Sequence, residues 1–375
     1  MTKKRIAVGF SGGKDSTAAA ITLKEQGHDV IALTMKLGLK NEQEKIAKIE
    51  NLTNVLNIPL RIVDMKDTFK EKVIDYFIHS YARGRTPNPC VICNNEIKFN
   101  ILMDYAVKRA RARSRWGTAN DHHKSGKSSQ KNKIVMQNSI GENCDLYATG
   151  HYADKVELNG QWFLKEPADK KKSQIYFLSM IGKERLAKVV FPIADLRIDE
   201  VRQKVAGLPL ANKLESQDVC FLQDINLMDY LKLYIPEKFK EGDILDINGN
   251  KIGTHQGAIY FTKGQRRGTR FSSDRKLYVV ETDVANNTIT LGENKHLFSE
   301  SITLREPVLW QEIKPGDVYK VKVRYLSTFS KAEITEVSAD HIRARFERPV
   351  RAVTPGQIGA FYNGDIIAAS GFIIY

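Results

Sequence analysis

The stretch that most constrains the fold lies near the N-terminus, where residues 6–17 read IAVGFSGGKDST. A short apolar run at 6–8 leads into a glycine-containing loop at 11–16, and an amphipathic stretch then runs from 17 to 26 and stops at Gly27. This order predicts a β-strand, a glycine loop and the N-terminus of a helix. The backbone N–H groups of such a loop and the helix dipole favour an anion, and the glycines let a phosphate approach the backbone. We therefore expect a phosphate-binding loop, although its spacing is not that of G-x-x-x-x-G-K-[ST].

Strand and helix patterns continue to alternate through the first part of the chain. Apolar runs at 29–35, 60–64 and 146–149 predict buried strands, and residues 41–56 and 67–82 carry apolar side chains at helical spacing. Repeated β-α units imply a parallel sheet with right-handed crossovers, in which a ligand lies beyond the carboxyl ends of the strands. Three segments occupy such ends and are expected to converge on one crevice: residues 11–16, Met35, and Gly150 with His151.

Length and charge narrow the class of protein. A chain of 375 residues is too long for one ordinary core, so two or three domains are expected. The formal net charge of +14 points to a polyanionic partner, although a basic, solvated surface alone would give the same excess. The sequence has no apolar run long enough to span a bilayer and no signal-peptide pattern, which predicts a cytoplasmic protein without a membrane partner.

A strongly basic segment separates the third and fourth predicted strands. Lysine and arginine dominate residues 108–133, where Asp121 is the sole acidic residue, and residues 117–133 contain few apolar side chains. Such a composition predicts a mobile loop. It is either an arm that contacts an RNA backbone or a tolerated insertion.

The second half of the chain is richer in short strands. Residues 224–240 are predicted to be helical, and beyond about 243 strand patterns recur between turns such as Asn248-Gly249-Asn250 and Asn286-Asn287. The predicted strands cover residues 246–248, 258–261, 277–281, 288–291, 318–325, 331–337, 341–346, 360–362 and 366–374. They indicate a small β-rich domain followed by a barrel.

The four cysteines are Cys90, Cys93, Cys144 and Cys220. In a cytoplasmic protein they point to metal binding or catalysis rather than to structural disulfides, although Cys144 precedes a buried strand and is expected in the core. The prolines at 87 and 89 predict an extended loop that delivers Cys90 and Cys93 just before a helix starting near Asn95. A helix N-terminus and basic neighbours favour the thiolate. Three cysteines allow either an iron–sulfur cluster with one open iron or thiol chemistry on two of them.

Seven ordered motifs give a resemblance to a known family. They are the SGGKDS loop, GRTPNPCVICNNEIKF at 84–99, ATGHYAD at 148–154, KKSQIYFL at 171–178, ESQDVCFL at 215–222, GQRRG at 264–268 and PGQ at 355–357. In this order the motifs resemble those of the tRNA-specific 2-thiouridylases (MnmA/TrmU), apart from a basic insertion at about 111–141. The resemblance implies an N-type ATP pyrophosphatase domain with a parallel sheet over 1–222, a small central domain over 223–276 and a C-terminal β-barrel over 277–375.

The resemblance also implies a reaction. ATP, with Mg²⁺, adenylates the C2 oxygen of the wobble uridine of tRNA, and sulfur then replaces that oxygen with release of AMP and pyrophosphate. The nucleotide-binding positions carried over are Gly9, Phe10, Ser11, Gly12, Gly13, Lys14, Asp15, Ser16, Met35 and Gly150. The family suggests tRNAs for Lys, Glu and Gln as substrates. The sulfur donor is a cysteine desulfurase, a relay protein or free sulfide.

The cysteines take their roles from the same resemblance. Cys220 matches the persulfide carrier, and Cys93 matches the second catalytic cysteine, which assists sulfur release and can close a disulfide with Cys220. Asn88, Pro89 and Cys90 match the segment that meets the flipped target base, since a stacked base hides its C2 edge. The other positions that match tRNA contacts are His151, Lys172, Ser173, Gln174, Arg324, Tyr325 and Gln357.

One departure from the family opens an alternative. Many members have aspartate where this chain has Cys90, and the change creates a Cys90-x-x-Cys93 pair in addition to Cys220. Related thiolation enzymes with this nucleotide loop hold a [4Fe–4S] cluster on three cysteines. A cluster on Cys90, Cys93 and Cys220 therefore stands beside the persulfide as a hypothesis.

Two rival functions explain less of the sequence. An amidotransferase-type synthetase acting on a small metabolite accounts for the nucleotide loop but not for the cysteines, the basic charge or the β-rich tail. A non-catalytic RNA-binding protein with a decayed nucleotide site accounts for the charge. It leaves the intact loop at 11–16 and the retained Cys93 and Cys220 unexplained.

Overall fold

The computed structural model describes residues 2–107, 142–210, 219–223, 225–269 and 271–374. The predicted basic loop at 108–133 lies outside these residues. The chain divides into two compact units, which we describe separately. The first unit comprises Met1–Asp67, Lys98–His151 and Lys188–Lys213, and the second comprises Thr68–Ile97, Tyr152–Ala187 and Leu214–Tyr375.

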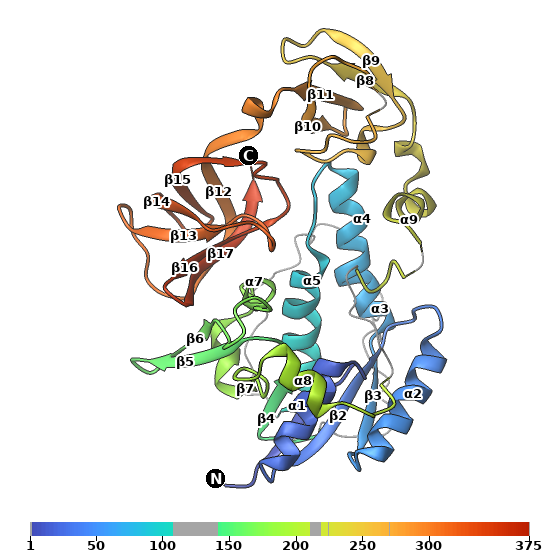
Figure 1. Cartoon of the computed structure of the whole chain (residues 1–375), viewed down its shortest axis with the longest axis vertical. Coiled ribbons are helices and arrows are strands. Elements are labelled where there is room, and N and C mark those ends of the chain that lie inside the picture. Colours follow the sequence, from blue (N-terminus) through green and yellow to red (C-terminus); the bar gives the residue numbers. More distant parts are fainter. Residues whose placement is uncertain (1, 108–141, 211–218, 224, 270, 375) are drawn as a thin grey trace, which may run out of the picture. The chain divides into compact units, whose positions relative to one another are not determined.

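A five-stranded parallel sheet forms the centre of the first unit (Figure 1). The strand order is β3-β2-β1-β4-β7, and every neighbouring pair is parallel. The strands are β1 (Arg5–Gly9), β2 (Asp29–Lys36), β3 (Leu60–Asp64), β4 (Leu146–Thr149) and β7 (Val189–Val190). The order of the strands along the chain reverses between β1 and β4. The carboxyl ends of these two strands therefore form the topological switch point, where α/β folds bind ligands.

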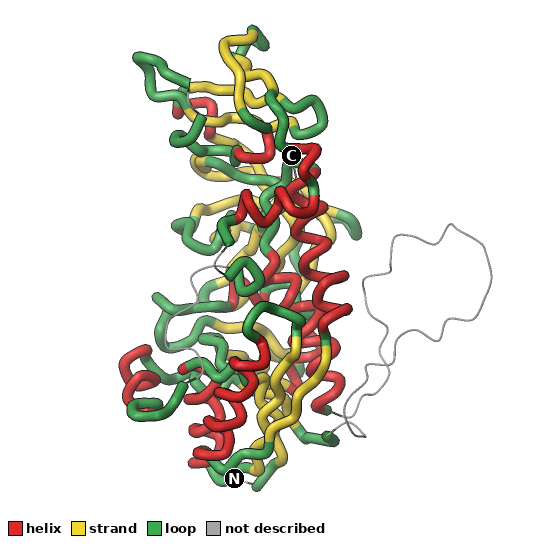
Figure 2. The backbone as a smooth tube through the Cα atoms, turned by 90° about the vertical axis from the view of Figure 1, so that its right-hand side faces the viewer, coloured by secondary structure: helices red, strands yellow, loops and turns green. Residues whose placement is uncertain are grey.

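Helices cover both faces of this sheet, as the alternation of side chains along the strands requires. Figure 2 shows them in red beside the yellow strands. On one face, α1 (Lys14–Glu25) and α2 (Glu42–Val55) share an apolar core with the even-numbered residues of β1. On the other face, Tyr147 of β4 lies edge to face with Phe99, their ring centroids 5.9 Å apart. A further helix, α8 (Ile198–Lys204), packs on α1.

Two helical runs follow β3. The first consists of α3 (Lys66–Phe69), the π-helix η1 (Lys70–Ile74) and α4 (Asp75–Ala82). The second consists of α5 (Pro89–Ile92), the π-helix η2 (Cys93–Leu102) and α6 (Met103–Ala106). π-Helical turns are rare and occur frequently at functional sites. The remaining helices are α7 (Ile175–Leu178), α9 (Leu227–Tyr234) and the 3₁₀ turns Lys183–Lys188, Pro236–Lys238, Ala258–Tyr260 and Asn294–Leu297.

The second unit contains a four-stranded sheet in the order β10-β11-β8-β9. Its strands are β8 (Gly242–Leu245), β9 (Lys251–His255), β10 (Tyr278–Asp283) and β11 (Thr288–Gly292). The two asparagine turns of the sequence analysis connect β8 to β9 and β10 to β11, as predicted. The apolar residues between the strands form a small core of their own, which includes Ile244, Val279 and Leu291.

A closed six-stranded antiparallel barrel completes the second unit. Its strands pair in the order β12-β15-β14-β13-β16-β17, and β17 pairs with β12 to close it. They are β12 (Phe298–Leu309), β13 (Val318–Lys322), β14 (Ser330–Val337), β15 (His341–Arg351), β16 (Ile358–Asn363) and β17 (Ile366–Ile374). A hairpin of β5 (Asp154–Leu158) and β6 (Gln161–Lys165) extends the sheet through Lys165, which pairs with Ile366.

The structure confirms the predicted fold class and corrects several elements. Residues 246–248 are a turn and not a strand, because the Asp246 carboxylate accepts the N–H groups of Asn248 and Asn250. Residues 258–261 begin as a 3₁₀ turn after Gly257, whose φ of +137° ends any extended run. Strands β5, β6, β7, β8, β9 and β12 were not predicted, and β12 contains a register shift next to Glu306. The predicted domain boundaries at 222 and 276 remain a proposal.

Among the described residues, no helix combines the length and apolar character that crossing a bilayer requires.

Candidate active site

The glycine loop between β1 and α1 is held by its own hydroxyl groups. Ser16 Oγ lies 3.2 Å from Ser11 Oγ, accepts the N–H of Ser11 at 3.3 Å and donates to the carbonyl of Gly13 at 3.1 Å. Gly12 has a φ of +73°, which favours glycine, and Gly13 is the N-cap of α1. Because Gly13 has no side chain, no capping group covers the first turn of this 12-residue helix. The loop therefore has the backbone geometry of an anion site.

Gly150 lies directly against this loop, as expected from their positions at the ends of β4 and β1. A Cβ atom on Gly150 would lie 2.5 Å from the carbonyl carbon of Asp15 and 2.5 Å from the nitrogen of Ser16. Only glycine allows such an approach between two backbones. The predicted convergence at the carboxyl edge of the sheet is thus observed for the loop and Gly150. Met35 is the penultimate residue of β2, near the same edge, where it is paired with Val63 of β3.

The neighbouring strand fixes the residues that lead into the loop. The Thr34 hydroxyl donates to the carbonyl of Phe10 at 2.7 Å, and the N–H of Phe10 donates to the carbonyl of Leu33 at 2.7 Å. A Cβ atom on Gly9 would lie 2.5 Å from the hydroxyl oxygen of Tyr147. Gly9 and Phe10, which the sequence analysis predicted to bind the nucleotide, are therefore tightly packed before the loop begins.

His151 follows Gly150 and is partly buried. Its Nδ1 lies 2.9 Å from the hydroxyl of Thr149, and its ring lies 5.8 Å from that of Phe99. Burial lowers the pKa of His151 well below its usual range, and the nearby charge of Lys98 lowers it further. This imidazole is therefore neutral at pH 7 and can offer a hydrogen bond without a charge.

The cysteine pair lies inside a helix, which corrects the sequence prediction. Helix α5 begins at Pro89 rather than near Asn95, because proline is well suited to the first helical position and Asn88 caps the helix. The Asn88 side chain accepts the N–H of Val91 at 3.3 Å. Cys90 is exposed on the first turn, whereas Cys93 is buried where η2 begins.

The other two cysteines differ in environment. Cys220 is exposed, and the next residue, Phe221, anchors its segment by packing against Phe69, Phe77 and Tyr230. Cys144 is buried, and burial raises the pKa of its thiol to about 11. Cys144 is therefore an inert core residue, as its position before β4 suggested.

The cluster hypothesis can be compared with the arrangement of these side chains. Cys90, Cys93 and Cys220 all belong to the described part of the chain. Within that part, no three His, Cys, Asp or Glu side chains come together in a group that could hold a metal ion. The three cysteines as arranged do not fit a [4Fe–4S] cluster, so no chemical step is derived through one.

Five of the residues predicted to contact tRNA lie in two segments of the second unit, at α7 and after β13. Lys172, Ser173 and Gln174 lead into α7, where the Gln174 side chain accepts the N–H of Tyr152 at 2.9 Å. Arg324 and Tyr325 follow β13, and the Tyr325 ring lies 4.4 Å from that of Phe177 in α7. The barrel loop and α7 are thus in contact.

Two contacting residues were missed by the sequence analysis although they lie inside its motifs. Asn94 is buried, and its amide donates to the carbonyl of Phe177 at 3.1 Å. Phe177 in turn carries the ring on which Tyr325 packs. Two signals in the sequence could have identified them. Asn94 directly follows a cysteine, and Phe177 is an aromatic residue near the end of a motif that begins with two lysines.

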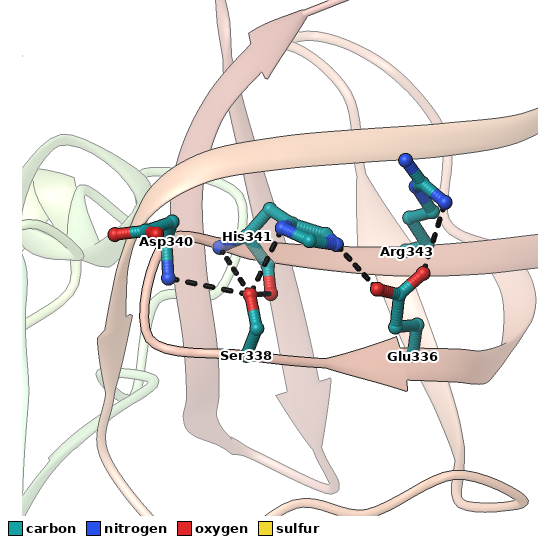
Figure 3. Close-up of polar contacts among 5 residues, drawn as sticks. All are labelled: Glu336, Ser338, Asp340, His341 and Arg343. Carbon is teal, nitrogen blue, oxygen red and sulfur yellow. Dashed lines mark hydrogen bonds and ion pairs between the residues drawn. The ribbon is translucent and has the colours of Figure 1, made fainter.

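A second polar cluster lies at the turn between β14 and β15 (Figure 3). Ser338 Oγ lies 2.9 Å from His341 Nδ1, and His341 Nε2 lies 2.7 Å from Glu336. This order resembles a hydrolytic triad, but Ser338 Oγ also accepts the N–H groups of Asp340 and His341. Arg343 holds the other oxygen of Glu336 at 2.9 Å. The cluster is therefore explained by closure of the hairpin turn.

Comparison with known proteins agrees with this architecture. Family models match in order a tRNA methyl transferase HUP domain (residues 4–143 and 128–224), a tRNA methyl transferase PRC-barrel domain (228–293) and an aminomethyltransferase β-barrel domain (299–373). A protein of Clostridioides difficile named tRNA-specific 2-thiouridylase MnmA is 36% identical over 99% of this chain and 98% of its own length. The chain belongs to the tRNA-specific 2-thiouridylase family.

Other members of the 2-thiouridylase family cover the chain equally well. A protein of the same name from Clostridium acetobutylicum is 33% identical over 99% of this chain and 99% of its own length. One from Treponema denticola is 34% identical over 98% of this chain and 97% of its own length. A solved structure titled a predicted subunit of tRNA methyltransferase, from Methanocaldococcus jannaschii, covers 62% of this chain and 87% of its own, with a TM-score of 0.31 and 15% identity. That likeness is too weak to bear on fold or function.

Membership in the 2-thiouridylase family confirms the resemblance inferred from the seven motifs. The matched domains follow the predicted order of catalytic α/β domain, small central domain and terminal barrel. The family match also covers residues 111–141, where the sequence analysis placed a basic insertion. These residues lie outside the described part of the chain.

Proposed function

We propose that this chain forms 2-thiouridine at the wobble position of tRNA and uses ATP to activate the uridine. The observation that carries the proposal is full-length similarity, because relatives named tRNA-specific 2-thiouridylase align with 98–99% of the chain. The glycine loop and the cysteines support it. Replacing a carbonyl oxygen by sulfur needs both a phosphate site for activation and a nucleophilic sulfur.

The activation step is assigned to the first unit. The loop at 11–16 and the first turn of α1 would hold the phosphates of ATP, with Lys14 facing their charge and Asp15 binding Mg²⁺ or ordering the loop. Met35 and Gly150 would line the nucleotide. The C2 oxygen of uridine attacks the α-phosphorus and pyrophosphate leaves. The oxygen, a poor leaving group in uridine, then departs readily as AMP.

The sulfur step is assigned to Cys220 and Cys93. A persulfide on Cys220 attacks C2 through its outer sulfur, and AMP leaves with the former carbonyl oxygen. The Cys93 thiolate then attacks the inner sulfur of Cys220, which breaks the S–S bond and leaves the outer sulfur on the base as 2-thiouridine. The resulting Cys93–Cys220 disulfide is reduced by an external dithiol. Cys90 would occupy the position of the aspartate that many relatives have.

tRNA binding is assigned to both units. In the second unit, Asn88, Pro89 and Cys90 would meet the flipped base, and Lys172, Ser173, Gln174, Arg324, Tyr325 and Gln357 would contact the RNA. In the first unit His151 would do so as a neutral side chain. The net charge of +14 supports a polyanionic substrate. The tRNAs for Lys, Glu and Gln are the proposed substrates, and a cysteine desulfurase or relay protein in the cytoplasm is the proposed donor.

A tRNA-dependent assay tests the activation step. Purified protein is incubated with ATP, Mg²⁺ and unmodified tRNA, without a sulfur donor, and pyrophosphate is measured. We expect pyrophosphate release only with a tRNA that has a wobble uridine, and none after omission of Mg²⁺. Pyrophosphate release that does not depend on tRNA would indicate a small-metabolite synthetase. Tight tRNA binding without pyrophosphate release would indicate a non-catalytic RNA-binding protein.

Anaerobic purification with iron analysis tests the sulfur step. We expect a colourless protein that thiolates tRNA when given a persulfide donor, and that loses this activity in Cys93→Ser and Cys220→Ser. Cys144→Ser is the matched control and should retain activity, because Cys144 is an inert core thiol. A brown protein whose activity follows its iron content would contradict the persulfide route.

A further inference from the structure

The loop that leads to the cysteine pair is hydrogen-bonded to the barrel through both backbone groups of one residue, Thr86. The N–H of Thr86 donates to the carbonyl of Pro355 at 3.0 Å, and the side-chain amide of Gln357 donates to the carbonyl of Thr86 at 2.9 Å. All of these residues belong to the second unit. Residues 354–357, which we call the barrel turn, connect β15 to β16. Thr86 lies three residues before the start of α5.

Gly356 lets the barrel turn approach this loop. Its φ of +91° favours glycine, and a Cβ atom there would lie 2.9 Å from Cβ of Arg85 and 3.0 Å from both N and O of Thr86. The contact with Arg85 is shorter than real Cβ atoms show, and the two contacts with Thr86 are tighter than nine in ten real Cβ contacts, so a side chain at 356 would require residues 85 and 86 to shift. The close packing is thus specific to glycine on the barrel side.

Two further contacts tie the start of α5 to the same region. The hydroxyl of Tyr176, a fully buried residue, donates to the carbonyl of Ile358 at 2.9 Å, and it is also hydrogen-bonded to the Asn88 side chain. Asn88 caps α5. One turn later, Asn94 is bonded to the carbonyl of Phe177. The segment from 86 to 94 is therefore held at its start, at its cap and next to Cys93.

We propose that Gln357 and Gly356 are positioning residues, which hold the 86–94 segment so that Cys93 stays buried and correctly aimed in the protein without tRNA. The amide nitrogen of Gln357 is engaged by Thr86, which gives this residue a role besides the RNA contact assigned to it above. The inference rests on the proposed catalytic role of Cys93. Misplacing a reacting group by about 1 Å can cost about 100-fold in rate, so loosening this segment lowers turnover.

The first test replaces the amide of Gln357. Gln357→Met keeps the length of the side chain and removes the donor to Thr86. Gln311→Met is the matched control, because Gln311 is a half-buried amide of the same unit whose nitrogen donates to Tyr319 at 3.0 Å. The measured quantity is the rate at which iodoacetamide alkylates Cys93 in tRNA-free protein, with the modified cysteine identified by mass spectrometry of peptides. We expect this rate to exceed that of the wild type by about threefold or more in Gln357→Met, and to be unchanged in Gln311→Met. We also expect a fall of about tenfold in kcat at saturating tRNA.

The second test uses glycine substitutions. Gly356→Ala inserts a methyl group against Arg85 and Thr86. Gly316→Ala has nearly the same backbone strain, with a φ of +90°, but within the described part of the chain no heavy atom beyond the adjacent residues lies within 4 Å of the added carbon. We expect both variants to lose thermal stability, Gly356→Ala by more because of its close contacts, and Cys93 to be alkylated faster in Gly356→Ala alone. If Gly356→Ala does not fold, the comparison of Gln357→Met with Gln311→Met still tests whether the barrel turn positions Cys93.

The outcomes separate this inference from the proposed function. Unchanged Cys93 alkylation in Gln357→Met, together with weaker tRNA binding, would make Gln357 an RNA contact only and overturn the inference. The catalytic proposal would survive that result as long as Cys93→Ser is inactive. An active Cys93→Ser would instead overturn the catalytic proposal, whatever the alkylation rates show.

Discussion

Two glycines of the first unit differ in what an added methyl group would meet. At Gly13 a Cβ atom would have only the Ser11 hydroxyl nearby, at 3.5 Å, whereas at Gly150 it would lie 2.5 Å from backbone atoms of residues 15 and 16. We expect Gly13→Ala to fold normally and bind ATP at least about tenfold more weakly, because the methyl group stands where a phosphate approaches the loop.

The matching expectation for Gly150→Ala is a loss of stability. Its methyl group overlaps the backbone of the loop, and overpacking of this kind costs about 1–3 kcal/mol or more. Urea unfolding and ATP titration of both variants check the pair. Normal ATP affinity in Gly13→Ala would contradict the phosphate assignment, and wild-type stability in Gly150→Ala would contradict the packing.

His151 gives a prediction about pH. Its pKa in the folded protein lies well below the unfolded value of about 6.5, so the unfolded state binds more protons as pH falls. The stability associated with neutral His151 is complete above pH 6.5 and is lost as pH decreases below it. We expect the free energy of unfolding to fall between pH 7 and 5.5 by up to about 1 kcal/mol more in wild type than in His151→Gln. Equal falls in the two proteins would show that His151 is not the responsible group.

Among the structural elements, α7 is anchored by a pair of hydrogen bonds from the barrel. The carbonyl of Ser179, just after α7, accepts the indole N–H of Trp310 at 2.8 Å and the hydroxyl of Ser370 at 2.7 Å. Trp310 is fully buried, so its replacement loses both packing and a donor. Because α7 also carries the Phe177 ring and the Tyr176 hydroxyl, this anchor supports the proposed RNA contacts.

Trp310→Phe should therefore destabilise the protein by about 2–3 kcal/mol, since the ring leaves a cavity while Ser370 still satisfies the carbonyl. Trp162→Phe is the control, because Trp162 on the β5–β6 hairpin is only partly buried and mainly packs under the ammonium of Lys155, 3.9 Å from its ring centroid. We expect a loss of less than about 1 kcal/mol there. Comparable losses in chemical denaturation would contradict the anchoring role.

Elements differ in how far the sequence predicted them. The strand at 60–64 and the strand at 146–149 were predicted with their observed bounds, because apolar residues predominate in both segments. Helix α5 was placed too late because proline was interpreted as a helix breaker, although at the first helical position it favours the helix. Strand β12 was missed because the positive φ of Glu306 and the following Pro307 interrupt its alternation.

For the whole molecule, motif order predicted more than local patterns did. The convergence of the glycine loop with Gly150 followed from the rule that ligands bind at the carboxyl ends of parallel strands. The bonds from Gln357 to Thr86 and from Asn94 to Phe177 could not be predicted, because they join segments 271 and 83 residues apart. No local pattern encodes such pairs, which arise only when segments far apart in the sequence pack together.

The most direct test of the account is nucleoside analysis of the product. Unmodified tRNA with a wobble uridine is incubated with the full chain, ATP, Mg²⁺, a persulfide donor and a dithiol, then digested and examined by mass spectrometry for 2-thiouridine. We predict 2-thiouridine at the wobble position in an amount equal to the pyrophosphate released, and none with Cys93→Ser or Cys220→Ser. Absence of 2-thiouridine with the folded wild-type chain, or its undiminished formation by the cysteine variants, would contradict the account.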